Sequence, residues 1–147
     1  MFKNILVPID LAIELVSAQQ LSAAKRFVES HGGKVTVLHV RRNLPGYAQN
    51  SVSSATNRKI MAEAEKMLET LAQTAGLSDQ AELVLLEGNP ARTILNHANK
   101  IGADLIIMAS HDPNITDYLV GSTAAHVVQR AHCSMFIVRN LQDDADR

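Results

Sequence analysis

The segment between residues 109 and 123 contains the residues best suited to bind an anion. It reads ASHDPNITDYLVGST, and Gly121, Ser122 and Thr123 lead into a predicted helix whose first turn has no acidic residue. The free N–H groups and the dipole at such a helix start favour phosphate. Glycine allows close approach, and the two hydroxyls can donate hydrogen bonds. From these residues alone, a serine that caps its own helix is the commoner case, so both interpretations of Ser122 stay open.

Asp10 is the second candidate, because it ends the first apolar run of the chain. A carboxylate there can accept hydrogen bonds from a ribose hydroxyl, as acidic residues do in other nucleotide-binding folds. The same residue could instead form a turn or cap the following helix. No lysine or arginine lies between residues 109 and 123. A triphosphate there would therefore depend on backbone amides, hydroxyls and a bridging cation such as Mg²⁺.

The histidines and the cysteine give weaker signals. His39 lies inside an apolar run, where a hydrogen-bonded core residue is more common than a ligand. His111 could polarise a phosphate or be fixed by a backbone hydrogen bond. Cys133 has no second cysteine for a disulfide or a zinc cluster and is expected to be a buried, inert thiol. The other histidines show no metal-ligand spacing: His31, His97, His126 and His132.

Five short aliphatic runs must position these residues. The runs are nearly continuous rather than alternating, which is typical of strands covered on both faces. They are Ile5–Ile9, Val35–Val40, Leu83–Leu86, Leu105–Ala109 and Met135–Val138. Small ligands bind beyond the carboxyl ends of strands in open α/β sheets. The positions to consider are therefore Asp10, Val40-Arg41, Glu87-Gly88 and the stretch after Ala109.

Segments with helical spacing separate the runs. Asn89 and Pro90 form an N-cap and first helical residue, and Gly102 ends that helix. A last short helix is expected from Gly121-Ser122 to near Ala131. In the first helix the apolar residues at helical spacing are Leu15, Ala18, Leu21, Ala24 and Val28. This alternation predicts an α/β domain with right-handed crossovers and a doubly wound, open parallel sheet.

Length and composition fit one domain. The chain has 147 residues, and we expect residues 1–140 to form the domain and residues 141–147 a frayed acidic tail. A net charge of −1 and 3% aromatic residues argue against nucleic acid as a partner. No apolar run is long enough to span a membrane, and a single cysteine fits the reducing cytoplasm. The polar stretch Asn43–Ser53 is either a surface loop or a lid.

The chain lacks the motifs of several classes of nucleotide-binding and phosphate-accepting proteins. The chain has no Gly-x-x-x-x-Gly-Lys-Ser/Thr motif of P-loop NTPases and no Gly-x-Gly-x-x-Gly after the first run, as dinucleotide dehydrogenases require. A response regulator needs an aspartate after the third run, where this chain has Glu87-Gly88-Asn89.

Four segments resemble the universal stress protein family, and within it the short single-domain bacterial members of the F and G type. They are Lys3–Asp10, Gly33–Val40, Ala103–His111 and Gly121–Val138. The resemblance extends to about Arg139. The order of a first-strand aspartate, a Ser-His loop and a Gly-Ser helix start is specific to the family.

The resemblance implies a Rossmann-like five-strand sheet of order 3-2-1-4-5 with four helices. It also implies a mostly non-catalytic sensor or adaptor of the stress response that binds ATP, ADP or AMP with Mg²⁺. In that arrangement Asp10 receives the ribose, the backbone near Pro8 and Val40 frames the adenine, and the 109–123 segment holds the phosphates. The expected contacts are Pro8, Ile9, Asp10, Val40, Met108, Ala109, Ser110, His111, Gly121, Ser122 and Thr123.

The resemblance also implies a homodimer. The last run, Met135–Val138, would lie at the sheet edge, where an aliphatic strand needs cover. Two other functions stay open. The nucleotide-binding members have glycines where this chain has Ala109 and Asp112, and its loop is one residue shorter, which leaves a nucleotide-free dimeric scaffold as an alternative. The other is a slow ATPase or nucleotidyl-transferring enzyme, although the loop has no evident general base with an orienting partner.

Overall fold

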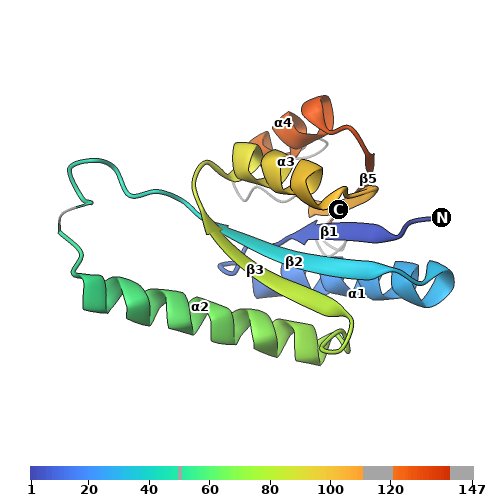
Figure 1. Ribbon diagram of the computed structural model, residues 1–147, viewed down its shortest axis with the longest axis horizontal. Helices are drawn as coiled ribbons and strands as arrows, with labels where there is room; N and C mark the ends of the chain where they lie inside the picture. The colour runs from blue at the N-terminus through green and yellow to red at the C-terminus, as the bar shows by residue number, and fades with distance from the viewer. Residues whose placement is uncertain (50, 111–120, 140–147) are drawn as a thin grey trace, which may run out of the picture.

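A computed structural model describes residues 1–49, 51–110 and 121–139, so the expected tail at 141–147 lies outside the described part. Strands and helices alternate through these ranges (Figure 1). The elements are β1 (Asn4–Pro8), α1 (Glu14–His31), β2 (Lys34–Arg41), α2 (Ser54–Thr74), β3 (Ala81–Glu87), α3 (Pro90–Ile101), β4 (Leu105–Ala109), α4 (Ser122–Arg130) and β5 (Ser134–Val138).

The strands form one parallel sheet in the order β3-β2-β1-β4-β5, which confirms the predicted fold class. Helices α1 and α2 cover one face and α3 and α4 the other, so the sheet is the middle of three layers (Figure 1). Successive strands are added on one side of β1 up to β3 and on its other side from β4 onward. Open α/β sheets bind ligands at such a change of direction, here between β1 and β4. None of the helices in the described ranges combines the length and apolar composition that a membrane crossing requires.

Two hydrophobic cores lie on the two faces of the sheet. Alternate residues of β1 supply them, because side chains along a strand point to opposite faces. Ile5 and Val7 belong to the core under α1 and α2, while Leu6 belongs to the core under α3 and α4. All three are at most 1% exposed, and burying such a side chain contributes about 1.5–3 kcal/mol. The continuous apolar run of this strand therefore reflects burial on both sides.

Capping residues fix the element ends close to their predicted places. The Asn89 side chain accepts a hydrogen bond from Arg92 N at 3.1 Å, and Pro90 follows it as expected. Gly102 ends the helix in the left-handed conformation with φ of 64°, which glycine adopts without strain. The first strand ends at Pro8 instead of Ile9, although Ile9 N still donates to Leu38 O on β2.

The buried face of α1 differs from the predicted apolar stripe. Leu15 is 51% exposed and Ala18 is also exposed, so these two residues were wrongly placed on the stripe. Ser17 and Gln20 are buried in their place, at 1% and 2% exposure. Both polar side chains donate hydrogen bonds to backbone carbonyl groups, which offsets the loss of water on burial. Hydrogen bonding, and not apolar spacing alone, therefore orients this helix.

Within the described ranges, no group of three His, Cys, Asp or Glu residues is placed to hold a metal ion.

Cys133 is half-buried just before β5. Burial, followed by the nearby Asp104 carboxylate, raises the pKa of its thiol. The thiol is therefore protonated at neutral pH, which agrees with the expected unreactive cysteine.

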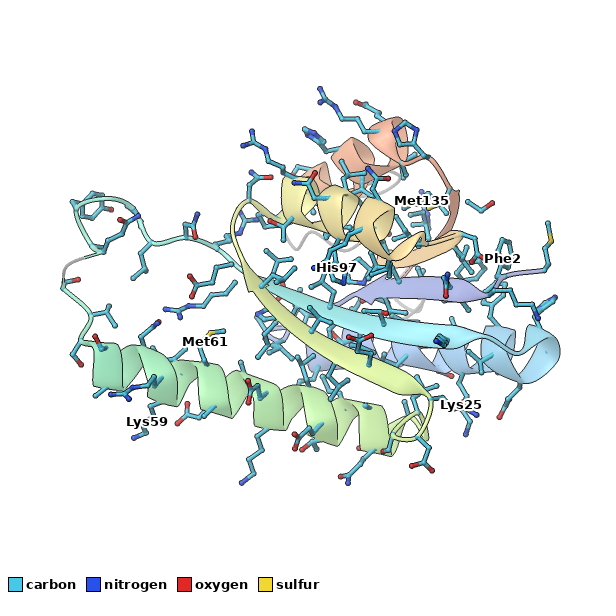
Figure 2. The ribbon with its side chains drawn as sticks, in the orientation of Figure 1. Phe2, Lys25, Lys59, Met61, His97 and Met135 are labelled. Carbon is cyan, nitrogen blue, oxygen red and sulfur yellow. The ribbon has the colours of Figure 1, made fainter. Side chains whose placement is uncertain are left out.

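His97 gives the fold a dependence on pH. It lies on the side of α3 that faces the sheet (Figure 2), and its Nε2 is buried with no hydrogen-bond partner among the described residues. Burial, and then the Lys100 charge, lowers the pKa of His97 from its ordinary value of 6.5, with Glu82 acting in the opposite direction. The unfolded chain therefore binds this proton more tightly than the folded chain does.

We expect the free energy of unfolding to fall as the pH drops through 6.5 toward the lower pKa of folded His97, and not to change above pH 7 on account of this group. Urea unfolding at a series of pH values checks this, with His97→Gln as the matched variant. Below pH 6.5 the free energy of unfolding of the wild type should fall progressively relative to that of His97→Gln. A constant difference across that range would contradict the prediction.

Candidate functional site

A cavity lies where β1 and β4 separate. Their register covers only Ile5 with Leu105 and Leu6 with Ile106, while β1 stays paired with β2 as far as Pro8. Proline has no N–H to donate, so Pro8 cannot extend a ladder toward β4. The result is a cavity of about 550 Å³ over the carboxyl ends of β1, β2 and β4.

The structure brings nearly all the predicted site residues to this cavity. Its wall includes Pro8, Ile9, Asp10, Val40, Met108, Ala109, Gly121, Ser122 and Thr123. Ser110 does not line it. Instead Ser110 N donates to Val138 O at 3.0 Å and Ser110 O accepts from Gly121 N at 3.3 Å, so this residue connects the end of β4 to β5 and to the start of α4. His111 lies outside the described residues.

Asp10 is held by three hydrogen bonds. Its Oδ1 accepts from Ala12 N at 2.9 Å, and its backbone oxygen accepts from Ser17 Oγ at 2.8 Å and Ile13 N at 3.1 Å. The turn role left open by the sequence is therefore present. The side chain is nevertheless exposed at the cavity wall, and the turn bond involves only one carboxylate oxygen. A fixed carboxylate of this kind is a good acceptor for hydroxyl groups.

The start of α4 presents backbone donors to the same cavity. Gly121 is the N-cap, Ala125 N donates to Gly121 O at 2.8 Å, and no side chain caps the helix. The interpretation of Ser122 as the cap is therefore wrong, because this serine is the first helical residue. The N–H groups of residues 122–124 have no partner within the helix, and the first turn has no acidic residue. This end of the cavity can hold an anion.

Two arginines at the opposite end of the cavity were not predicted as site residues. Arg41 and Arg42 follow Val40 at the end of β2 and line the cavity. The position of Arg41 was predicted to lie near a strand end, but neither arginine was assigned a role, because cations were considered only between residues 109 and 123. Strand β1 separates β2 from β4, and neighbouring strands are about 4.8 Å apart. The arginines therefore line the β2 side of the same cavity that the start of α4 lines.

Two side chains at the cavity wall hold the backbone around it. Gln20 Nε2 donates to Pro8 O at 2.7 Å and to Ile107 O at 3.2 Å, so it bridges β1 and β4 where they separate. His39 Nδ1 lies 3.1 Å from Ile9 O and must carry the proton, because a carbonyl only accepts. The expected hydrogen bond of His39 is confirmed, and the ring also lines the cavity. Gln20 could have been noticed, since it interrupts the apolar side of α1.

Comparison with known proteins gives one consistent result. The model of the universal stress protein family matches residues 1–139. The universal stress protein YxiE of Bacillus subtilis is 31% identical over 150 residues, covering 95% of this chain and all of that protein.

Solved structures share the fold. A universal stress protein in complex with cAMP has a TM-score of 0.68 at 20% identity, with 94% of this chain and 97% of that chain covered. The universal stress protein from Archaeoglobus fulgidus in complex with dAMP also has a TM-score of 0.68 at 20% identity, with 92% and 97% covered.

Proposed function

The chain belongs to the universal stress protein family, and from that premise we propose that it binds an adenine nucleotide in the cavity between β1 and β4. ATP is the favoured ligand, with ADP and AMP as shorter forms of it. The protein would act as a sensor or adaptor of the stress response, as a single domain over residues 1–140, in the cytoplasm and without dedicated catalysis. The observation that carries the proposal is the uncapped, acid-free start of α4 facing the same cavity as Asp10.

The positions of the cavity residues support one orientation of the nucleotide. The adenine would lie against Val40 and the Pro8–Ile9 backbone, and the Asp10 carboxylate would accept from the ribose hydroxyls. The phosphates would then lie at the start of α4, where free N–H groups and the hydroxyls of Ser122 and Thr123 can donate. The two related structures with cAMP and dAMP contain adenine nucleotides, which agrees with this choice of base.

Mass spectrometry of the protein purified under native conditions is the direct test. We expect a bound adenine nucleotide, released on denaturation, or a rise in melting temperature when ATP, ADP or AMP is added to the stripped protein. A chain that carries no nucleotide and whose melting temperature responds to none of the three would be a nucleotide-free scaffold instead.

We predict that ATP binds weakly without Mg²⁺. No lysine or arginine lies in the segment between residues 109 and 123, and Mg²⁺ binds through one or two carboxylates together with phosphate oxygens. Calorimetric titration with ATP should give a lower affinity in EDTA than in excess Mg²⁺, and equal affinities would contradict the prediction.

We further propose a homodimer through β5. This strand is at the edge of the sheet, and Phe136 on it is 41% exposed. Light scattering at micromolar concentration should give twice the mass of one chain. Phe136→Asp should shift the protein to the monomer, whereas Ile60→Asp, at a 39% exposed position on α2, should leave the dimer intact. A monomeric wild-type protein would refute the proposal.

A further inference from the structure

A second cavity lies beside the first. Its volume is about 240 Å³, and it is enclosed by the end of β2, the loop that follows and the beginning of α2. Arg41 and Arg42 line both cavities, so the two meet at this pair of residues. Figure 1 shows the same region as the long connection that leaves β2 and enters α2. A ligand in the first cavity can therefore extend past the arginines into the second.

The two arginines differ in what they contact. Arg41 Nη1 donates to Asn57 Oδ1 and, at 3.1 Å, to Glu87 Oε1, and its side chain is only 20% exposed. Its charge is therefore balanced by Glu87, the acidic residue of the second cavity wall. Arg42 is exposed and forms no ion pair or side-chain hydrogen bond within the described residues. The net charge available to a ligand where the cavities meet is that of Arg42.

We propose that the second cavity is an anion subsite for the same ligand, with Arg42 as its binding residue. The ligand class is a nucleotide that carries phosphate on both the 5′ and the 3′ side of its ribose. This inference rests on the proposed function, because it takes the position of the ribose from Asp10.

The order of the strands supports this ligand class. The start of α4 follows β4, Asp10 follows β1 and Arg42 follows β2, and these three strands are neighbours in the sheet. The wall of one cavity thus offers phosphate donors at the start of α4, a ribose acceptor at Asp10 and a cation at Arg42. The long arginine side chain can reach from the end of β2 into both cavities. A guanidinium group is well matched to phosphate oxygens.

Calorimetric titration with ADP and with adenosine 3′,5′-bisphosphate tests the proposal, since both carry two phosphates and differ only in where these are attached. We expect the 3′,5′-bisphosphate to bind about tenfold more tightly than ADP, the effect of one charge-assisted hydrogen bond. Arg42→Gln should remove this preference, because it should weaken the 3′,5′-bisphosphate about tenfold more than it weakens ADP. Arg130→Gln, at the far end of α4, should keep it. Melting curves show that each variant is folded.

The outcomes distinguish a failure of the proposed subsite from a failure of the proposed function. If ADP binds but the 3′,5′-bisphosphate binds no more tightly, or if Arg42→Gln weakens both ligands equally, the subsite is refuted and the proposed function stands. If neither ligand binds the wild-type protein, both are refuted. Arg42→Lys keeps the charge but loses the planar donor pair, so it should retain part of the preference.

Discussion

Replacing Gly121 with aspartate is expected to abolish the protection that an adenine nucleotide gives against thermal unfolding. Aspartate is a favoured N-cap residue, and its carboxylate would accept hydrogen bonds from the N–H groups of Thr123 or Ala124, which the wild-type helix leaves without a cap. Those are the donors proposed for phosphate, and the added negative charge repels the ligand as well. The substitution should therefore remove binding, while the new cap offsets part of the cost of placing a carboxylate at this buried position.

The size of the effect follows from linkage. At about 100 times its dissociation constant a ligand adds about 2.7 kcal/mol of stability, which is about 5–10 °C in melting temperature for a chain of this length. We expect this shift in the wild type and none in Gly121→Asp.

Two control variants separate charge from capping. Gly121 has φ of −53°, which any residue can adopt, so Gly121→Ala should be folded and keep most of the shift. Gly121→Asn caps without charge and should give an intermediate value. An undiminished shift in Gly121→Asp would refute the assignment of this helix start to phosphate.

Gln20→Leu is expected to destabilise the fold more than any other single substitution considered above. The side chain is 2% exposed and supplies a hydrogen bond to a carbonyl group on each side of the gap between β1 and β4. Leucine has a similar size but no donor, so both Pro8 O and Ile107 O would remain buried without this partner. Each such loss costs about 1–3 kcal/mol. Urea unfolding should show a loss of about 2–5 kcal/mol.

The neighbouring residue offers a matched control. Gln19 is on the same helix, and its Oε1 is buried without a hydrogen-bond partner in the part of the chain that the structure describes. Gln19→Leu removes an unsatisfied polar atom, so it should be neutral or slightly stabilising. Equal losses in the two variants would show that the helix tolerates no leucine at either place and that the bridge from Gln20 is not the cause.

Periodicity predicted the architecture because the central strands β1, β2 and β4 are covered on both faces. The continuous apolar runs and the Asn89-Pro90 and Gly102 caps are local signals, and the structure confirms them. The strand order came from the family resemblance, since alternation of strands and helices alone does not determine it.

Residues of the candidate site were predicted where one short segment of sequence contains them. They were missed where segments distant in the sequence come together. The helix start at Gly121 and the strand end at Asp10 are visible in short stretches of sequence. The roles of Arg42 and Gln20 depend on which strands are neighbours and on how α1 turns its face toward the sheet. Apolar spacing put Leu15 on the inner face of that helix, because it gives no weight to a glutamine that is buried by its hydrogen bonds.

The bridge that Gln20 makes has a consequence for how the binding preference of such a protein can diverge. The Gln20 side chain both bridges β1 to β4 and lines the cavity. Natural variation at this position is therefore constrained by folding. Arg42 is exposed and forms no such bridge, so its replacement is not constrained by folding in this way. Among descendants of one ancestor, new ligand preferences should therefore arise first on the β2 side, while the α1 side stays the same.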